Sequence, residues 1–289
     1  MNKKSTAIVT SLALGGILLF GTAFVNASQL SGYQSFKGAV NDTKNLKNGT
    51  INLQLAVSDN GNNIINANSN VKLNLNANAM SSVTTVKSGS DTQTFNSYKQ
   101  DGKSITKDNN SNEYIVKQNG SKNINGKDKV ENPAVSKSVE VVMDTLVGSM
   151  QNKVSVTGNT DGTKKDSINL NSSEITPLSN ALASIALIRN DNEAVNYNKV
   201  NLNSLKNVIP QLQSNIKIES INSNGDINKN DVITDQTAVI VLSGDDANGK
   251  QHNIKFDINL TLSNINNTTP DKVDLNGKQV KTITSHFGE

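Results

Sequence analysis

The stretch Ile254-Lys255-Phe256-Asp257-Ile258-Asn259-Leu260-Thr261-Leu262 decides the fold class. Every second residue in it is large and apolar, and the residues between carry charged, amide or hydroxyl side chains. Alternation with a period of two is typical of a β-strand that turns one face to a core and the other to water. We therefore expect a strand here, within an antiparallel sheet.

The same alternation recurs elsewhere along the chain. It covers Ile51–Val57, where Asp59-Asn60-Gly61 follows as a strong hairpin signal, and then Val71–Ala77. Shorter apolar runs between turn residues predict further strands at Ser82–Lys87, Thr92–Lys99, Lys103–Lys107, Glu113–Lys117, Lys153–Thr157, Asp166–Asn171, Ile216–Ile221, Thr237–Leu242 and Gln279–Thr284.

Other segments have apolar residues at helical spacing. Tyr33, Phe36 and Val40 predict a helix over Gly32–Lys47, and three further helices are expected at Ala134–Asn152, from Pro177 to Ile188 and at Leu202–Val208. Helices with an apolar stripe and a sheet with one apolar face bury each other. The expected fold class is α+β, a curved antiparallel β-sheet (a half-barrel) packed on several α-helices.

The N-terminus has the pattern of an export signal. Lys3 and Lys4 precede an apolar run from Ala7 to Val25, and Val25-Asn26-Ala27 resembles a signal peptidase site. Residues 1–27 are predicted to be a signal peptide cleaved after Ala27, with an uncleaved membrane anchor as the alternative. Residues 28–289 then form a single domain, with 28–130 and 131–289 as two subregions.

Composition narrows the class of protein. The chain has no cysteine, which rules out disulfides, and this fits an exported protein of a Gram-positive surface, either secreted or anchored to the membrane by its N-terminal segment. Its formal net charge of +3 includes the lysines of the signal, so nucleic acid is not expected as a partner. Asparagine makes up about one residue in six, which suits turns and neutral hydrated surfaces.

Four short patterns resemble a known family. They are Tyr33, Phe36 and Ala39; Leu46-Lys47-Asn48-Gly49-Thr50-Ile51; Val57-Ser58-Asp59-Asn60-Gly61; and Tyr98-Lys99-Gln100-Asp101-Gly102-Lys103. Together they resemble exported Firmicutes proteins of the LolA/LppX-like lipoprotein-carrier type. The resemblance implies a half-barrel closed by helices around an apolar cavity that holds acyl chains. The chain lacks the lipobox cysteine that many of these relatives carry.

The sequence offers few residues for chemistry. His252 and His286 lie in no catalytic or metal motif, and both are interpreted as surface histidines. No cofactor is expected, and the chain is not predicted to be an enzyme. Alternate oxygen side chains at Asn222, Asn224 and Asp226 make a weak Ca²⁺ candidate, against the simpler interpretation of a loop between strands. Asp245-Asp246 is interpreted as a turn.

Two functional hypotheses follow. In the first, the protein is a non-catalytic cell-envelope protein that binds a lipid or other amphiphile in an apolar cavity lined by Leu178, Leu182, Ile185, Ile254, Phe256, Ile258 and Leu260. In the second, the same fold has a solid core, and its asparagine-rich outer face binds cell-wall polymer or another protein. Cavity volume separates the two, since only the first hypothesis requires an open interior.

Overall fold

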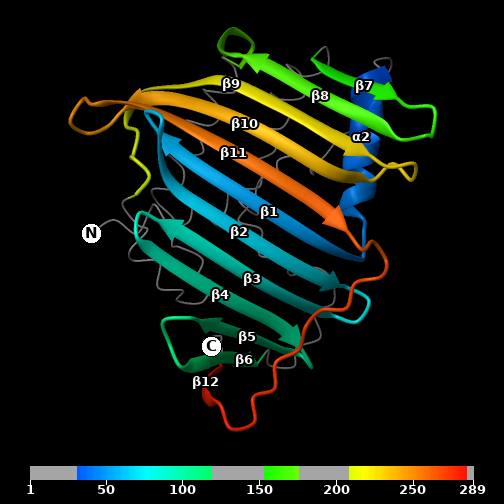
Figure 1. Cartoon of the computed structure of the whole chain (residues 1–289), viewed down its shortest axis with the longest axis vertical. Helices are drawn as coiled ribbons and strands as arrows, with labels where there is room; N and C mark the ends of the chain where they lie inside the picture. The colour runs from blue at the N-terminus through cyan, green and yellow to red at the C-terminus, as the bar shows by residue number, and fades with distance from the viewer. Residues whose placement is uncertain (1–30, 119–152, 176–207, 285–289) are drawn as a thin grey trace, which may run out of the picture. The chain divides into compact units, whose positions relative to one another are not determined.

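The computed structural model describes residues 31–118, 153–175 and 208–284. Strands account for 62% of these residues and helices for 9%, in two helices. The strands form one large mixed sheet of 12 strands that is not closed, in the order β12-β6-β5-β4-β3-β2-β1-β11-β10-β9-β8-β7 (Figure 1). The expected α+β half-barrel with several helices is therefore wrong, because the described chain is mostly β.

The sheet differs from the expected one in the length of its strands and in the direction of its last strand. Strands extend further than the sequence pattern indicated, most of all β9 (Ser214–Ile227), which takes in the polar run expected to be a loop. The last strand, β12 (Gln279–Thr284), pairs with β6 (Glu113–Gln118) in parallel, so the sheet is mixed and not antiparallel throughout. The helices expected at 134–152 and 177–188, and nearly all of the one expected at 202–208, lie outside the described residues.

The chain forms two compact units, and three long strands contribute residues to both. These are β1 (Asn48–Asp59), β2 (Asn62–Asn74) and β11 (Gln251–Ser263). Unit 1 comprises residues 1–45, 55–65 and 131–259, and unit 2 comprises 46–54, 66–130 and 260–289.

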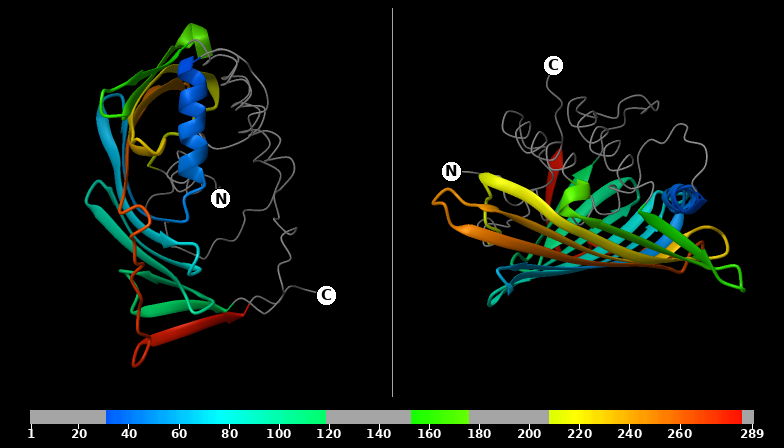
Figure 2. Two further views of the ribbon diagram at one scale, coloured as in Figure 1. Left: turned by 90° about the vertical axis from the view of Figure 1, so that its right-hand side faces the viewer. Right: turned by 90° about the horizontal axis from the view of Figure 1, so that it is seen from above.

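In unit 1 one helix packs against one side of four strands (Figure 2). The helix is α2 (Ser31–Lys44), and the strands are β7 (Val154–Gly158), β8 (Lys164–Asn171), β9 and β10 (Ile233–Asp245). The expected helix is confirmed apart from its C-terminal residues. Its stripe is buried, and the shared core comprises Tyr33, Phe36, Ala39, Val40, Val154, Ile168, Leu170, Ile175, Ile218, Ile227 and Ile233.

Both ends of α2 are fixed to strands. At Gly32 an added Cβ would lie 2.7 Å from the carbonyl oxygen of Val154, so only glycine permits this approach. At the other end the Thr43 hydroxyl donates to the Ala39 carbonyl at 2.6 Å and accepts from the backbone N–H of Ile233 at 2.8 Å. The helix therefore joins the edge strand β7 to the start of β10.

In unit 2 the strands form an antiparallel meander with tight turns. It contains β3 (Ala79–Ser88), β4 (Asp91–Gln100) and β5 (Lys103–Asp108), followed by β6. The Asp101-Gly102 turn has φ of 50° and 71°, the pair of positive values that a two-residue type I′ hairpin needs. In unit 1, Asn60-Gly61 has the same signature, with φ of 49° and 82°. The hairpin predicted from sequence at Asp59-Asn60-Gly61 is therefore confirmed.

Residues 264–278 form a strap that crosses one face of unit 2 and leads into β12. Two amide side chains bind its backbone as a neighbouring strand would. Asn48 Nδ2 donates to Thr268 O at 2.8 Å while Asn48 Oδ1 accepts from Thr268 N at 2.6 Å, and Gln100 makes the same pair with Val273 at 2.9 Å each. Between them Asp271 accepts from Lys72 Nζ at 2.8 Å.

The strap explains why β12 is parallel. It crosses β1, β2, β3 and β4 in turn through Asn48, Lys72, Ser81 and Gln100, and so carries the chain beyond β5 to the open edge of β6. The chain reaches that edge after a crossover and not a hairpin, which permits the parallel direction.

The strap should depend on the Asn48 amide. Replacement by alanine leaves the backbone N–H and C=O of buried Thr268 without these partners, so we expect Asn48→Ala to lower the free energy of unfolding by about 2 kcal/mol. Urea denaturation measures this. Asn68→Ala, which removes an exposed amide from β2, is the matched control and should change stability by less than about 0.5 kcal/mol. Equal effects of the two substitutions would contradict the role of the strap.

Candidate functional site

The structure places only some of the predicted site residues. Of the expected apolar lining, Ile254 and Phe256 on β11 are 2% and 4% exposed, while Ile258 and Leu260 are half-buried. Leu178, Leu182 and Ile185 lie outside the described residues. The alternation predicted for β11 is therefore confirmed, with Ile254 and Phe256 as its two most buried members.

The Ca²⁺ candidates lie within strand β9. Asn222, Asn224 and Asp226 share one face of the strand, and β9 pairs with β8 on one side and β10 on the other. The alternative of a loop is therefore wrong, since pairing on both sides overrides the turn preference of asparagine and glycine. Asp226 accepts from Lys165 Nζ at 2.5 Å, and no cluster of three metal-ligating side chains occurs in the described ranges.

His252 is buried, which corrects the surface interpretation. It is 4% exposed, because position 252 shares its face of β11 with Ile254 and Phe256. The sequence alternation already indicated this burial, because His252 lies two residues before Ile254 and so falls on the same face of the strand. Asp59 likewise continues the series of Leu55 and Val57 on β1. His286 lies outside the described residues.

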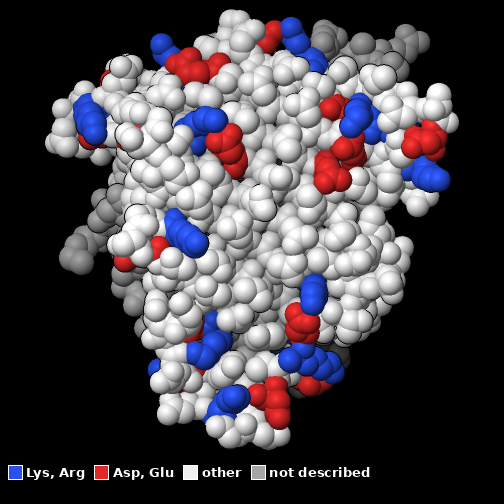
Figure 3. All heavy atoms as spheres, in the orientation of Figure 1, with Lys and Arg blue, Asp and Glu red and all other residues white. Residues whose placement is uncertain are grey.

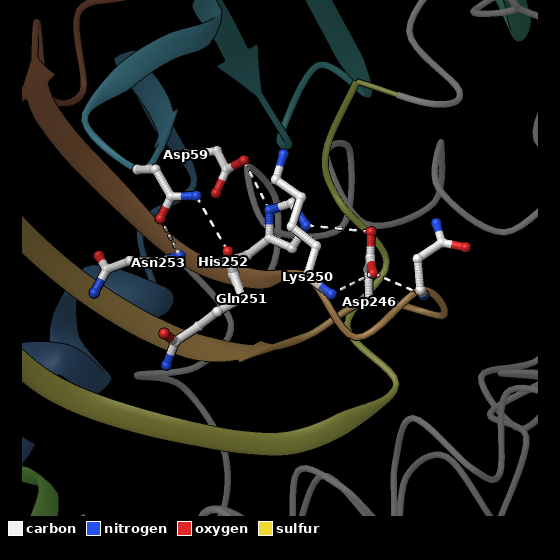
Figure 4. A network of polar contacts seen from close by, with 8 residues as sticks. Asp59, Asp246, Lys250, Gln251, His252 and Asn253 are labelled. Atoms are coloured by element: carbon white, nitrogen blue, oxygen red, sulfur yellow. Dashed lines mark hydrogen bonds and ion pairs between the residues drawn. The ribbon is translucent and has the colours of Figure 1, made fainter.

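The His252 ring lies between two carboxylates of unit 1 (Figure 4). Its Nδ1 is 2.8 Å from Asp59 Oδ2, and its Nε2 is 3.5 Å from Asp246 Oδ2. Asp246 lies in the turn between β10 and β11, as predicted. It accepts from the backbone N–H of Lys250 and of Asn248, and these bonds, followed by His252, lower the pKa of its carboxyl.

This arrangement is suited to holding hairpins together. In a catalytic triad one histidine nitrogen faces a hydroxyl or thiol. Here both ring nitrogens face carboxylates, and among the described residues no hydroxyl bonds to the ring. Asn60 reinforces the same junction, because its Nδ2 donates to Gln251 O at 3.2 Å and its Oδ1 accepts from Asn253 N at 3.1 Å. The cluster joins the β1–β2 turn to the start of β11.

The outer face of unit 2 has the other distinctive set of side chains. Register places Asn70, Val83 and Asn96 in one row across β2, β3 and β4, and Asn68, Thr85 and Thr94 in the next. We call these six residues the amide–hydroxyl patch. Val83 at its centre is 43% exposed, and the strap covers the adjoining row of Lys72, Ser81 and Tyr98.

Hydrogen bonds orient the patch side chains. Asn70 Nδ2 donates to Asn52 Oδ1 at 2.6 Å, and the hydroxyls of Thr85 and Thr94 are 3.0 Å apart. No member of the patch is charged, and Figure 3 shows lysine and acidic residues gathered around the middle of these strands and not over it. The patch thus presents neutral donors and acceptors around one exposed apolar side chain.

No family model and no curated protein matches the chain. Solved structures give weak likenesses. A β-barrel-like protein of domain of unknown function DUF1849 from Brucella abortus is 8% identical, over 75% of this chain and 98% of that one, with a TM-score of 0.18. A variant of the PpsC dehydratase domain from Mycobacterium tuberculosis is 11% identical over 87% and 82%, with a TM-score of 0.14. These scores carry no argument about fold or function.

The export signal stays a prediction from sequence. Residues 1–30 lie outside the described residues. Among the helices that are described, none combines the length and the hydropathy that crossing a membrane requires.

The His252 cluster predicts a stability effect. Replacing His252 by leucine leaves the largely buried Asp59 carboxylate without its hydrogen-bond partner, so we expect His252→Leu to lower the free energy of unfolding by roughly 3 kcal/mol. The double variant with Asp59→Leu removes the stranded carboxylate and should recover part of the loss. Denaturant titration of the wild type, both single variants and the double variant measures the coupling. Additive losses would show that the two side chains do not interact.

Proposed function

We propose that the chain is an exported, non-catalytic cell-envelope protein that binds a neutral, hydroxyl-rich wall polymer through the amide–hydroxyl patch of unit 2. The observation that carries the proposal is the uncharged grid of amides and hydroxyls around exposed Val83. Export rests on the N-terminal sequence pattern.

The chemistry of the patch suits a sugar polymer. Amide side chains donate and accept at once, and threonine hydroxyls do the same, so both match the hydroxyl groups of a sugar ring. The ring also has an apolar C–H surface, for which the exposed methyl groups of Val83 offer a contact. Two rows of residues on three paired strands supply a regular array of contacts for an extended chain.

The absence of charge within the patch favours a neutral ligand over an acidic one. Binding to an anionic polymer would draw on concentrated lysine, and such binding weakens as salt screens the charges. Lysines lie beside the patch and not in it: Lys72 is paired with Asp271, and Lys107 donates to the backbone carbonyl of Asp108. Binding through the patch should therefore change little with ionic strength.

The lipid-carrier hypothesis stays a prediction. It requires an apolar surface open to a ligand, whereas Ile254 and Phe256 are both buried. The half-buried Ile258 and Leu260 do not by themselves define a ligand site. The described residues thus give more specific support to the solid-core alternative, in which the outer face makes the contact.

Co-sedimentation with purified insoluble wall polysaccharide tests the proposal. Val83→Asp places a charge at the centre of the patch on an exposed position, so we expect binding at least about tenfold weaker, or about 1.4 kcal/mol. Asn259→Asp adds the same charge at an exposed position on β11 in unit 1 and should bind as the wild type does. Thermal melts confirm that both variants are folded.

Two outcomes would overturn the proposal. One is wild-type protein that remains in the supernatant with the polysaccharide. The other is Val83→Asp that sediments as strongly as the wild type.

A further inference from the structure

Three neighbouring strands of unit 1 place two polar side chains on either side of a glycine. Asp166 of β8 pairs in register with Gly225 of β9, and Gly225 pairs in register with Gln236 of β10. Asp166 is 3% exposed and Gln236 is 8% exposed. Asp166 lies on the same face of β8 as Ile168 and Leu170, which pack in the core beneath α2. A carboxyl and a carboxamide are thus buried together among apolar residues.

Gly225 is what allows the two side chains to meet. A Cβ at position 225 would lie 2.2 Å from Gln236 Oε1 and 2.4 Å from Asp166 Oδ2. Both oxygens therefore occupy the space that a side chain at position 225 would fill if the residue were anything but glycine. The side chains from the two outer strands converge over the middle strand.

Hydrogen bonds satisfy the polar atoms on one side of the Asp166–Gln236 pair. Gln236 Nε2 donates to Asp166 Oδ1 at 3.1 Å and to the Ser223 hydroxyl oxygen at 2.8 Å, while that hydroxyl donates to Thr237 O at 2.7 Å. The opposite edge has two acceptors and no donor. Asp166 Oδ2 and Gln236 Oε1 are both buried, and neither has a hydrogen-bond partner among the described residues.

We propose that Asp166 is held as a neutral carboxylic acid and closes a cyclic acid–amide pair with Gln236 over Gly225. The acid O–H donates from Oδ2 to Gln236 Oε1, while Gln236 Nε2–H donates to Oδ1. One proton thereby satisfies both orphaned acceptors, and a buried acceptor left unsatisfied is costly. The pair is a proton-dependent latch that joins β8 to β10 across β9.

The surroundings of Asp166 favour the neutral acid. Burial is the largest influence that raises the pKa of its carboxyl, the hydrogen bond from Gln236 opposes this, and the negative charge of Asp226 adds to it. Lys165 and Asp226 bond to each other, and β7 brings only Val156 into register with Asp166.

Other ionisable groups nearby do not supply a counter-charge. Lys164, two residues earlier on the same face, is held by Asp231 at 2.5 Å and lies 3.5 Å from the Ser35 hydroxyl. The titratable group on the buried stripe of α2 is Tyr33, whose pKa burial raises to about 12, so it is neutral at physiological pH. Among the described residues no cation is thus committed to Asp166.

The latch gives unit 1 a defined response to pH. Because the pKa of Asp166 is raised on folding, its stabilising contribution is fully present below the ordinary aspartate pKa of 3.8. The contribution is lost as the pH rises through the value in the folded protein, where the proton leaves and a carboxylate faces Gln236 Oε1. The contribution of Asp166 to the stability of unit 1 should therefore increase on acidification and decrease as the pH rises.

Asp166→Asn tests the latch, because an asparagine amide supplies permanently the donor that the acid has only when protonated. We expect the variant to melt at a higher temperature than the wild type at pH 8, and the difference to shrink as the pH falls towards 4. Asp235→Asn is the matched control, since it removes an exposed carboxylate from β10, and it should follow the wild type at every pH. An Asp166→Asn protein that melts below the wild type at pH 8 would overturn the proposal.

A second measurement does not require the variant to fold. Carboxyl ¹³C NMR of the wild-type chain labelled at aspartate, with the Asp166 signal assigned, follows its titration directly. The proposal predicts a midpoint above 3.8. A midpoint at or below that value would show that Asp166 is ionised in the folded protein and would overturn it.

Discussion

Alternation of side chains between the two faces of a paired strand is the constraint on which the rest of this structure depends. On β11 it sends His252, Ile254 and Phe256 to the buried face and leaves Gln251, Asn253 and Lys255 exposed. Register then carries the pattern from strand to strand, so that one polar residue out of place becomes a polar group in the core. The features that matter here, the latch, the histidine cluster and the amide–hydroxyl patch, are all consequences of that register.

Sequence reasoning succeeded where this constraint acts locally. The hairpin turns, the helix stripe of Tyr33 and Phe36, and most strands follow from short-range periodicity and turn chemistry. It failed where pairing on both sides overrides local preference, as in β9, whose asparagines and Gly225 suggested a loop. Sequence reasoning also predicted the strand at Gln279–Thr284 but missed its parallel direction, because that direction depends on where the strap leads the chain and not on residues 279–284 themselves.

For the candidate sites too, local sequence predicts the burial of single residues, whereas only the fold shows which residues meet. The burial of His252 was readable from its phase in the alternation, but its two carboxylate partners come from β1 and from a turn, and only the fold brings them together. The pairing of Asp166 with Gln236 needs the register of three strands and a glycine in the middle one, which no local pattern reveals. The patch around Val83 likewise needs the register of β2, β3 and β4.

The central claim is that ligand contact occurs at the outer face of unit 2 and not at the buried stripe. Methyl NMR of protein labelled at valine and isoleucine, titrated with soluble fragments of wall polysaccharide, tests it most directly. The account predicts shifts of the Val83 methyl signals while those of Ile254 stay unchanged. Shifts at Ile254 with none at Val83 would contradict it and would favour a ligand in the interior.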